Sequence, residues 1–256
     1  MLTGPSFDLT GRIALITGSS RGIGLAFAEG LASAGAEVVI SSNEPDELER
    51  ARARLVEDGA RAHALAFDVT DRAAIEAAVD RIETEIGAVD ILVANAGIQR
   101  RMAFVDFDPD TYRAVMATNL DHIFFVGQAV ARRMIPRGRG KIINTCSLNS
   151  EIGRQSIIPY TASKGAVKML TKGMCVELAR HGIQVNGIGP GYMKTEMNRA
   201  LVDNPEFSSW VAARTPAGRW GELDEMKSAV VFLASDSSSF VNGQVIYVDG
   251  GFTSSM

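Results

Sequence analysis

The 256-residue sequence predicts a single α/β domain in which a parallel, doubly wound sheet has helices on both faces. The first observation behind this is a repeated unit: a stretch of helical length, a glycine, and then a short apolar run. The unit recurs at AGAEVVI, DGARAHALAF, IGAVDILVA, RGRGKIINT and HGIQVNGI. The second observation is that no linker rich in proline, glycine or serine divides the chain, so residues 1–256 are predicted to form one domain.

The glycines of this unit are predicted to end helices, because glycine takes the left-handed conformation without a Cβ clash. They are Gly35, Gly59, Gly87, the pair Gly138 and Gly140, and Gly182. The runs after them are mostly apolar on both faces, which is typical of strands buried between two helical layers. Stretches such as residues 71–86 and 160–181 have the length and apolar spacing of helices.

The composition excludes several classes of function. A net charge of −4 and a pI near 5.5 argue against nucleic acid or an anionic membrane as the main partner. The start of the chain does not resemble a signal peptide, and no run of about eighteen apolar residues indicates a membrane span. Cys146 and Cys175 form no CxxC pair and the three histidines are scattered, so we expect no metal site and a cytoplasmic location.

A glycine-rich turn follows the first predicted strand, residues 12–17. The turn reads TGSSRGIG, from Thr17 to Gly24, and a helix begins at about Ile23. Gly18 can make the sharp turn, Gly22 lets a pyrophosphate approach the backbone, and Gly24 lets the helix pack closely on the sheet. In this position between strand and helix, the turn predicts a dinucleotide site in a Rossmann-type fold.

The same turn also matches G-x-S-x-G, the motif that carries the nucleophile of α/β-hydrolases, with Ser20 as the attacking residue. Such a serine needs a histidine base on a loop after a strand. His122 lies within a helical pattern and His181 at a helix end, so a serine hydrolase is kept only as a remote alternative.

The end of the second strand bears on the choice of coenzyme. Many dinucleotide folds place an acid there to bind the ribose hydroxyls, and this favours NAD. Here the strand ends at Ser41, Ser42 and Asn43, and the nearest acid is Glu44. If Glu44 points at the ribose, NAD is favoured. If Ser42 takes the place of the acid, no carboxylate repels a 2′-phosphate and Arg21 can pair with it, so NADP(H) is favoured over NAD(H).

Ser147, Tyr160 and Lys164 form a predicted catalytic set. Tyr160 and Lys164 are four residues apart and share one face of a helix, and Ser147 follows the predicted strand 141–146 at the carboxyl edge of the sheet. Lowering a phenol pKa from about 10 by about three units requires about 4 kcal/mol. An ammonium about 5 Å away supplies about 3 kcal/mol at an effective dielectric near 20, so a positive nicotinamide beside the pair is needed as well. Tyr160 would then exchange a proton with an alcohol or ketone that Ser147 holds.

The same residues could instead be a packing tyrosine at a helix start and a hydroxyl at a strand end. The glycine-rich turn in the same chain favours the catalytic interpretation.

The chain is similar to the short-chain dehydrogenases/reductases. The resemblance is carried by TGSSRGIG, NAG at Asn95 to Gly97, Asn119, Ser147, YTASK at Tyr160 to Lys164, PG at Pro190 and VDGG near the end. It implies an NAD(P)-dependent oxidoreductase, usually a homotetramer with the Tyr160 helix at an interface. It also implies that Asn119 joins the catalytic set and holds a water that relays protons through Lys164. The family's usual NNAG begins with Ala94 here, which puts one hydrogen bond of the sheet in doubt.

The resemblance also assigns coenzyme contacts. Asp68 and Val69 would flank the adenine, Asn95 would lie near its ribose, and residues 188–195 would cover the nicotinamide. The full predicted coenzyme set is Gly18, Ser20, Arg21, Gly22, Ile23, Gly24, Ser42, Asn43, Asp68, Val69, Asn95, Ala96, Gly97, Tyr160, Lys164, Pro190, Gly191, Met193 and Thr195.

Longer stretches resemble one subgroup of this family, the gluconate 5-dehydrogenases. These are NAGIQRR at residues 95–101, residues 150–197, TPAGRWGE at 215–222 and FVNGQVIYVDGG at 240–251. They imply interconversion of D-gluconate and 5-keto-D-gluconate, with reduction of another polyol or of a 3-oxoacyl thioester as the alternative. Arg101 and Arg154 would bind the acid group, and Glu151 would accept hydrogen bonds from hydroxyls. The alternative interpretation of each of these three residues is a solvated charge on the surface. Asn149 and Tyr192 complete the predicted substrate set with Ser147 and Tyr160.

The segment at about residues 193–214 has few sheet signals and is predicted to form a helical flap over the crevice. Pro190 and Gly191 would lie near its hinge, and the flap would close over coenzyme and sugar acid to exclude water.

Overall fold

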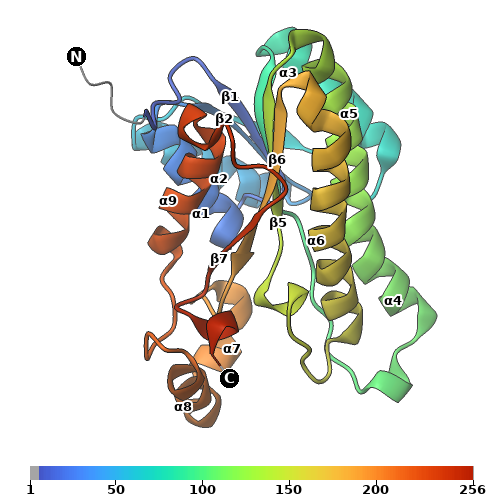
Figure 1. Cartoon of the computed structure of the whole chain (residues 1–256), viewed down its shortest axis with the longest axis vertical. Helices are drawn as coiled ribbons and strands as arrows, with labels where there is room; N and C mark the ends of the chain where they lie inside the picture. Colours follow the sequence, from blue (N-terminus) through green and yellow to red (C-terminus); the bar gives the residue numbers. More distant parts are fainter. Residues whose placement is uncertain (1–5, 256) are drawn as a thin grey trace.

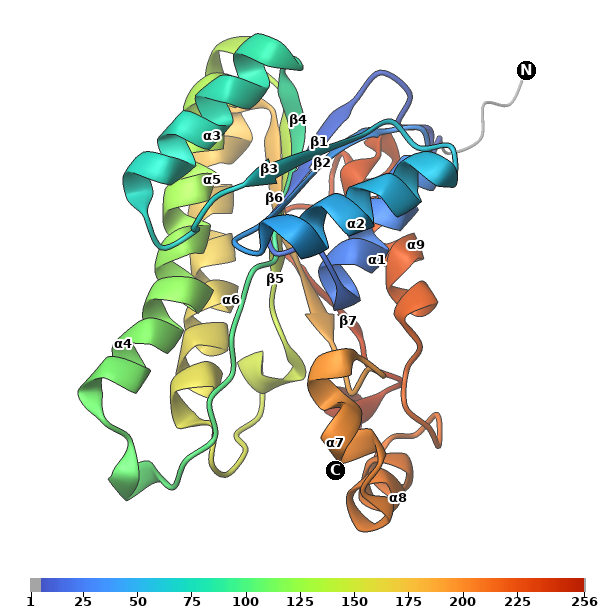
Figure 2. The ribbon, with the colours of Figure 1, turned by 180° about the vertical axis from the view of Figure 1, so that it is seen from behind.

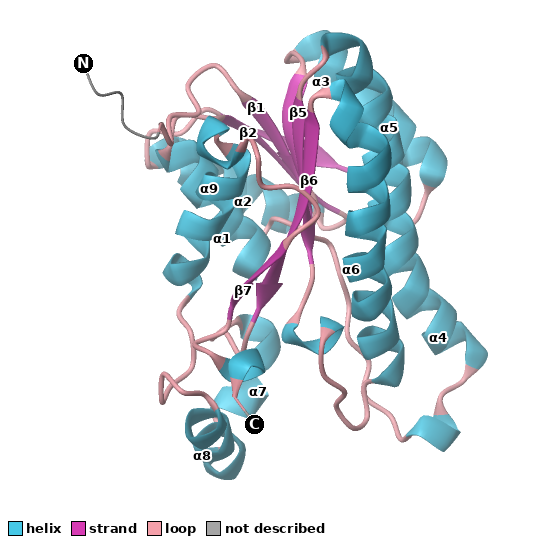
Figure 3. Ribbon diagram, in the orientation of Figure 1, coloured by secondary structure: helices cyan, strands magenta, loops and turns pink. Residues whose placement is uncertain are grey.

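The structure, a computed structural model, describes residues 6–255 and contains one seven-stranded parallel sheet (Figures 1 and 3). The strands are β1 (Ile13–Ile16), β2 (Glu37–Ser42), β3 (Ala62–Ala66), β4 (Val89–Ala94), β5 (Gly140–Thr145), β6 (Ile183–Pro190) and β7 (Val245–Val248). They are arranged in the order β3-β2-β1-β4-β5-β6-β7, and every pairing is parallel. The predicted doubly wound α/β fold is therefore confirmed.

Helices cover both faces of the sheet (Figure 2). The longer ones are α1 (Gly22–Ser33), α2 (Pro45–Glu57), α3 (Arg72–Glu85), α4 (Pro109–Met116), α5 (His122–Arg137), α6 (Ile158–Leu178), α8 (Pro205–Arg214) and α9 (Lys227–Ala234), and α7 (Arg199–Val202) is a single turn. Helices α1, α2 and α9 pack on one face, and α3, α5 and α6 pack on the other. Among residues 6–255, no helix combines the length and the apolar character needed to cross a membrane.

The two faces form two separate apolar cores, because consecutive strand residues point to opposite sides of the sheet. In β1, Leu15 joins the core under α3, α5 and α6, and Ile16 joins the core under α1, α2 and α9. Both side chains are fully buried. This explains why the predicted strands are apolar at successive positions rather than at alternate ones.

Most of the predicted helix ends are found at the expected glycines. Gly35, Gly59, Gly87, Gly138 and Gly182 all have positive φ. At Gly182 a Cβ would also collide with the carbonyl oxygen of Gly138. Gly140 does not end a helix: it begins β5, where a Cβ would meet the side chain of Met134. The lack of a side chain at Gly140 thus lets α5 pack closely against the start of β5.

Two elements differ from the sequence-based expectation. Strand β7 was not predicted, and its four residues are only partly buried at the edge of the sheet. The helical pattern that contains His122 is preceded by a π-helical turn, Ala117–Asp121, between α4 and α5. Such turns occur frequently at functional sites.

The segment predicted as a flap is helical. It contains a short 3-10 turn, Glu196–Asn198, followed by α7 and α8. Figure 1 shows α7 and α8 below the carboxyl ends of β6 and β7, at the edge where parallel sheets bind ligands.

Candidate active site

A cavity of about 510 Å³ lies at the carboxyl edge of the sheet. Every residue of the predicted coenzyme set lines it, from the glycine-rich turn after β1 to the segment after β6. Glu44, the nearest acid after the second strand, lines the cavity as well. The structure also adds lining residues that the sequence did not indicate: Phe67, Thr70, Ile98, Gln99, Thr118, Thr145, Cys146, Leu148, Glu196 and Asn198. The coenzyme and catalytic residues predicted from separate motifs therefore meet in one space.

The glycine-rich turn leaves room for a dinucleotide. Gly22 has a φ of +59°, and a Cβ built there would meet no atom within 4 Å. At Gly18 a Cβ would lie 2.6 Å from the Cα of Ala96, and at Gly24 it would collide with the Gly18 carbonyl oxygen. Helix α1 begins at this turn without a side-chain cap, so its first N–H groups are available to an anion. These features fit the pyrophosphate of a nicotinamide dinucleotide.

Asn95 holds three strand ends together beside this turn. Its side-chain amide donates to the carbonyl oxygens of Thr17 at 3.0 Å and Gly18 at 2.9 Å, and its Oδ1 accepts from Thr145 Oγ1 at 3.2 Å. One position earlier, Ala94 pairs with Asn144 of β5. Asn144 Oδ1 is buried and has no hydrogen-bond donor in the described part of the chain, which matches the bond expected to be missing at Ala94.

The predicted catalytic side chains converge at one end of the cavity. Ser147 follows β5, and Tyr160 and Lys164 lie one turn apart in α6. Lys164 is buried, donates from Nζ to the Thr145 carbonyl oxygen at 2.6 Å, and lies 5.8 Å from the centre of the Tyr160 ring. Ser147 Oγ accepts from the Asn149 N–H at 3.1 Å, so its hydroxyl proton can be donated to the Tyr160 oxygen or to a ligand.

Burial acts on both ionisable groups of this set. It raises the pKa of the Tyr160 phenol, and a hydrogen bond with Ser147 opposes the rise. Burial also lowers the pKa of Lys164 to about 8. The protein alone therefore does not lower the pKa of the phenol. A second positive charge beside Tyr160 is needed, as expected from the sequence.

Asn119 lies on the π-helical turn and is fully buried, outside the lining of the cavity. Its Oδ1 accepts from the Ile98 N–H at 2.8 Å, and its Nδ2 donates to the Ile98 carbonyl oxygen at 2.9 Å and to Ser163 Oγ at 3.2 Å. Ser163 Oγ in turn donates to the Tyr160 carbonyl oxygen at 2.7 Å. In this arrangement Asn119 positions the loop after β4 against the helix that carries Tyr160, and its water-relay role stays a prediction.

The hydrolase alternative is wrong. Ser20 Oγ donates to Glu47 at 3.0 Å rather than to a histidine. His122 is fully buried and contacts Thr17 and Thr118, and burial lowers its pKa to about 3. No histidine lines the cavity.

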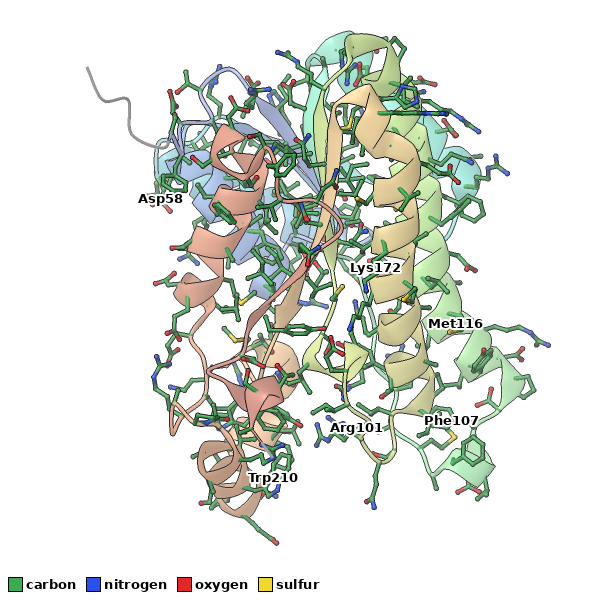
Figure 4. The ribbon with its side chains drawn as sticks, viewed as in Figure 1. Asp58, Arg101, Phe107, Met116, Lys172 and Trp210 are labelled. Carbon is green, nitrogen blue, oxygen red and sulfur yellow. The ribbon has the colours of Figure 1, made fainter. Side chains whose placement is uncertain are left out.

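Arginines gather at the substrate end of the cavity. Arg101, Arg154, Asn149 and Tyr192 line it as predicted. Neither guanidinium pairs with a carboxylate of residues 6–255, and burial together with the charge of Arg154 lowers the pKa of Arg101. Figure 4 shows Arg101 at the same end of the molecule as Trp210 of the flap.

The prediction for Glu151 requires a correction, because this residue does not line the cavity. Its carboxylate pairs with Lys168 and accepts from Tyr247 Oη at 2.6 Å. These partners hold the pKa of Glu151 below its usual value and tie the loop before α6 to β7.

The functional contacts that sequence reasoning missed are mainly backbone groups and residues from a neighbouring helix. The Thr145 carbonyl that accepts from Lys164 has no sequence signal. Glu47 of α2 accepts from both Ser20 and Arg21, across 27 and 26 residues of chain. The one sequence signal that could have revealed Glu47 is its place in the first turn of the helix after β2.

A family model described as enoyl-(acyl carrier protein) reductase matches residues 18–253. The chain belongs to the short-chain dehydrogenase/reductase family. Gluconate 5-dehydrogenase of Gluconobacter oxydans is 54% identical over 98% of both chains, and 5-keto-D-gluconate 5-reductase of Escherichia coli K12 is 53% identical over 96% of both. A gluconate 5-dehydrogenase from Burkholderia cenocepacia, solved in complex with NADP and tartrate, is 56% identical, covers 98% of this chain and 99% of its own, and superposes with a TM-score of 0.95.

This short-chain dehydrogenase/reductase is thus an NAD(P)-dependent oxidoreductase. The predicted family and Rossmann-type fold are confirmed, and use of a nicotinamide dinucleotide agrees with the lining of the cavity.

Proposed function

We propose that the enzyme interconverts D-gluconate and 5-keto-D-gluconate with NADP(H). The observation that carries the proposal is the pair Arg101 and Arg154, which line the same cavity as Ser147 and Tyr160 and have no carboxylate partner among residues 6–255. Two guanidinium groups favour a substrate with an acid group, because arginine binds carboxylates through paired N–H donors. The curated relatives that are more than half identical act on this substrate pair by name.

The chemistry follows from the groups at the catalytic end. In oxidation, the Tyr160 phenolate removes the hydroxyl proton of the substrate while Ser147 donates a hydrogen bond to the same oxygen. The bound dinucleotide would accept the hydride that leaves the carbon. In reduction, Tyr160 gives its proton to the carbonyl oxygen. Lys164, held on the Thr145 carbonyl, places its ammonium beside the phenol.

NADP(H) is proposed as the preferred coenzyme. Ser42 ends β2 where an acid would repel a 2′-phosphate, and it lines the cavity together with Arg21. Arg21 lies 2.7 Å from Glu47, so its guanidinium is held at the turn but shares its charge with a carboxylate. We expect Arg21→Ala to raise the KM for NADP about fivefold, as for an exposed charged hydrogen bond, and to leave the KM for NAD unchanged.

Absorbance at 340 nm tests the function directly. D-gluconate, D-glucitol and an oxoacyl thioester are assayed with NADP(H) and NAD(H) under identical conditions. We expect the highest kcat/KM for gluconate with NADP. A higher value for the thioester would support the acyl reductase alternative, and a higher value for glucitol would support a neutral polyol.

The homotetramer expected from the resemblance is also proposed here. Helix α6 exposes Met169 at 61% and Val176 at 80%, seven residues apart and so on one face. A second copy would cover this apolar surface. Sedimentation velocity should show a tetramer for the wild type. Val176→Glu places a charge on this apolar surface and should give smaller species. The cytoplasmic location stays a prediction.

A further inference from the structure

Arg154 joins the loop after β5 to the flap through contacts with aromatic rings. It lies in the loop between β5 and α6, and its guanidinium carbon lies 4.7 Å from the centre of the Phe207 ring and 5.6 Å from that of Tyr192. Phe207 belongs to α8 of the flap, and Tyr192 follows β6. A guanidinium over an aromatic face is attracted by the electrons of the ring.

The two rings belong to an aromatic cluster that docks the flap. Tyr192 makes edge contacts with Phe207, Trp210, Trp220 and Phe252, with ring centres 5.2 to 5.9 Å apart. Trp220 is 4% exposed, and its Nε1 donates to Ser208 Oγ of α8 at 2.8 Å. The position of Phe207 over Arg154 therefore depends on how α8 sits on the body.

Stacking fixes Arg154 in a way that suits an acid group. The attraction to the two rings acts through the charge of the guanidinium and not through its N–H donors, so a hydrogen bond to the Tyr192 hydroxyl leaves the remaining donors for a ligand. An ion pair with a protein carboxylate would use those same donors. An arginine held over aromatic rings thus stays in place while most of its donors remain available to the ligand.

We infer that Phe207 is a positioning residue that orients Arg154 toward the acid group of the substrate, so that recognition of the acid depends on the docked flap. The inference rests on the proposed function. It adds that the flap contributes to choosing an acidic substrate, besides any role in excluding water. Phe207 does not line the cavity, so its effect must pass through Arg154.

Steady-state kinetics of four variants test this inference. Phe207→Leu should raise the KM for gluconate about fivefold, which corresponds to about 1 kcal/mol, with kcat and the KM for NADP within twofold of wild type. Phe207→Tyr keeps the ring and should restore the wild-type KM. Trp210→Leu removes a neighbouring ring of the same cluster that does not contact Arg154, and should leave the KM for gluconate within twofold. Arg154→Leu should raise that KM more than Phe207→Leu does.

A binding measurement keeps the test independent of turnover. The two tryptophans of the chain, Trp210 and Trp220, both lie in the cluster, so their fluorescence reports on the flap. Titration of D-gluconate into the NADPH-saturated enzyme, in which no hydride can leave gluconate, should give a Kd that follows the KM in each variant. D-glucitol, which lacks the acid group, should show no difference between wild type and Phe207→Leu.

The outcomes separate the two proposals. If Arg154→Leu weakens gluconate binding and Phe207→Leu does not, the inference is overturned and the proposed function is retained. Equal weakening by Phe207→Leu and Trp210→Leu would also overturn it, because the cluster would then act only on the stability of the flap. If Arg154→Leu leaves gluconate binding unchanged, both the carboxylate site and the inference fail.

Discussion

Removal of the positive charge of Lys164 should shift the pH dependence of oxidation. Its Nζ lies 5.8 Å from the centre of the Tyr160 ring, and Lys164 is buried while Tyr160 is partly buried beside the cavity. At this separation and an effective dielectric near 20, the ammonium stabilises the phenolate by about 3 kcal/mol. Since about 1.4 kcal/mol corresponds to one unit, Lys164→Met should raise the pKa of Tyr160 by about two units.

The direction of the change follows from the base that Tyr160 provides. Oxidation needs the phenolate, and burial already raises the pKa of Tyr160. Below this pKa the rate falls about tenfold for each unit of pH, because the fraction of phenolate falls in that proportion. The acid limb of the kcat/KM profile should therefore move about two units upward in Lys164→Met, and the rate near pH 7 should fall about a hundredfold.

The assay follows reduction of NADP at 340 nm between pH 6 and pH 11, with coenzyme at saturation so that weaker coenzyme binding does not contribute. Lys164→Arg retains the charge and should keep the acid limb within about one unit of wild type. If the profile of Lys164→Met superposes on that of wild type after scaling, the ammonium does not tune the phenol. Its role would then be to hold the coenzyme.

Three further perturbations follow from buried contacts. Because the pKa of His122 is lowered to about 3 and an unfolded histidine titrates near 6.5, unfolded chains bind the extra proton as pH falls. Wild type should thus lose about 2 kcal/mol more unfolding free energy than His122→Gln between pH 7 and pH 5, as measured by urea denaturation. Gly24→Ala should raise the coenzyme Kd at least tenfold in a fluorescence titration, because the new Cβ collides with the Gly18 carbonyl; an unchanged Kd would contradict the close packing. Asn119→Ala should cost about 2 kcal/mol of stability in urea, because it leaves the Ile98 N–H and carbonyl without partners, and an unaltered midpoint would show that water replaces them.

The sequence predicted that Ser147, Tyr160 and Lys164 meet in one place, because their geometry is local. Tyr160 and Lys164 lie four residues apart on one helix, and Ser147 follows a strand whose end must lie at the ligand edge of a parallel sheet. The glycine-rich turn is equally local, since strand, turn and helix are consecutive. Each of these placements needs only the period of one element and the direction of one strand.

The less predictable features depend on contacts between distant segments. Glu151 has the charge expected of a hydroxyl acceptor, yet Tyr247 and Lys168 bind it, and Tyr247 belongs to β7, a short edge strand that the pattern did not reveal. The π-helical turn that carries Asn119 is hidden in a continuous helical pattern. These features arise from packing of segments up to 96 residues apart, which periodicity does not describe.

The two unpaired arginines show how the site can favour an acid over a neutral polyol. Burial of Arg101 and, to a smaller extent, the positive charge of Arg154 lower the pKa of Arg101, so holding this guanidinium charged costs free energy in the free enzyme. An anionic ligand offsets the repulsion between the two guanidinium groups, whereas a neutral polyol of the same shape leaves the repulsion in place. The rings of Phe207 and Tyr192 attract the Arg154 guanidinium but carry no net negative charge. They therefore hold the cation in place and do not neutralise it, so an anionic ligand is still bound favourably. Selectivity for a sugar acid therefore follows from what the arginines lack in the free protein as much as from the contacts they can form with substrate.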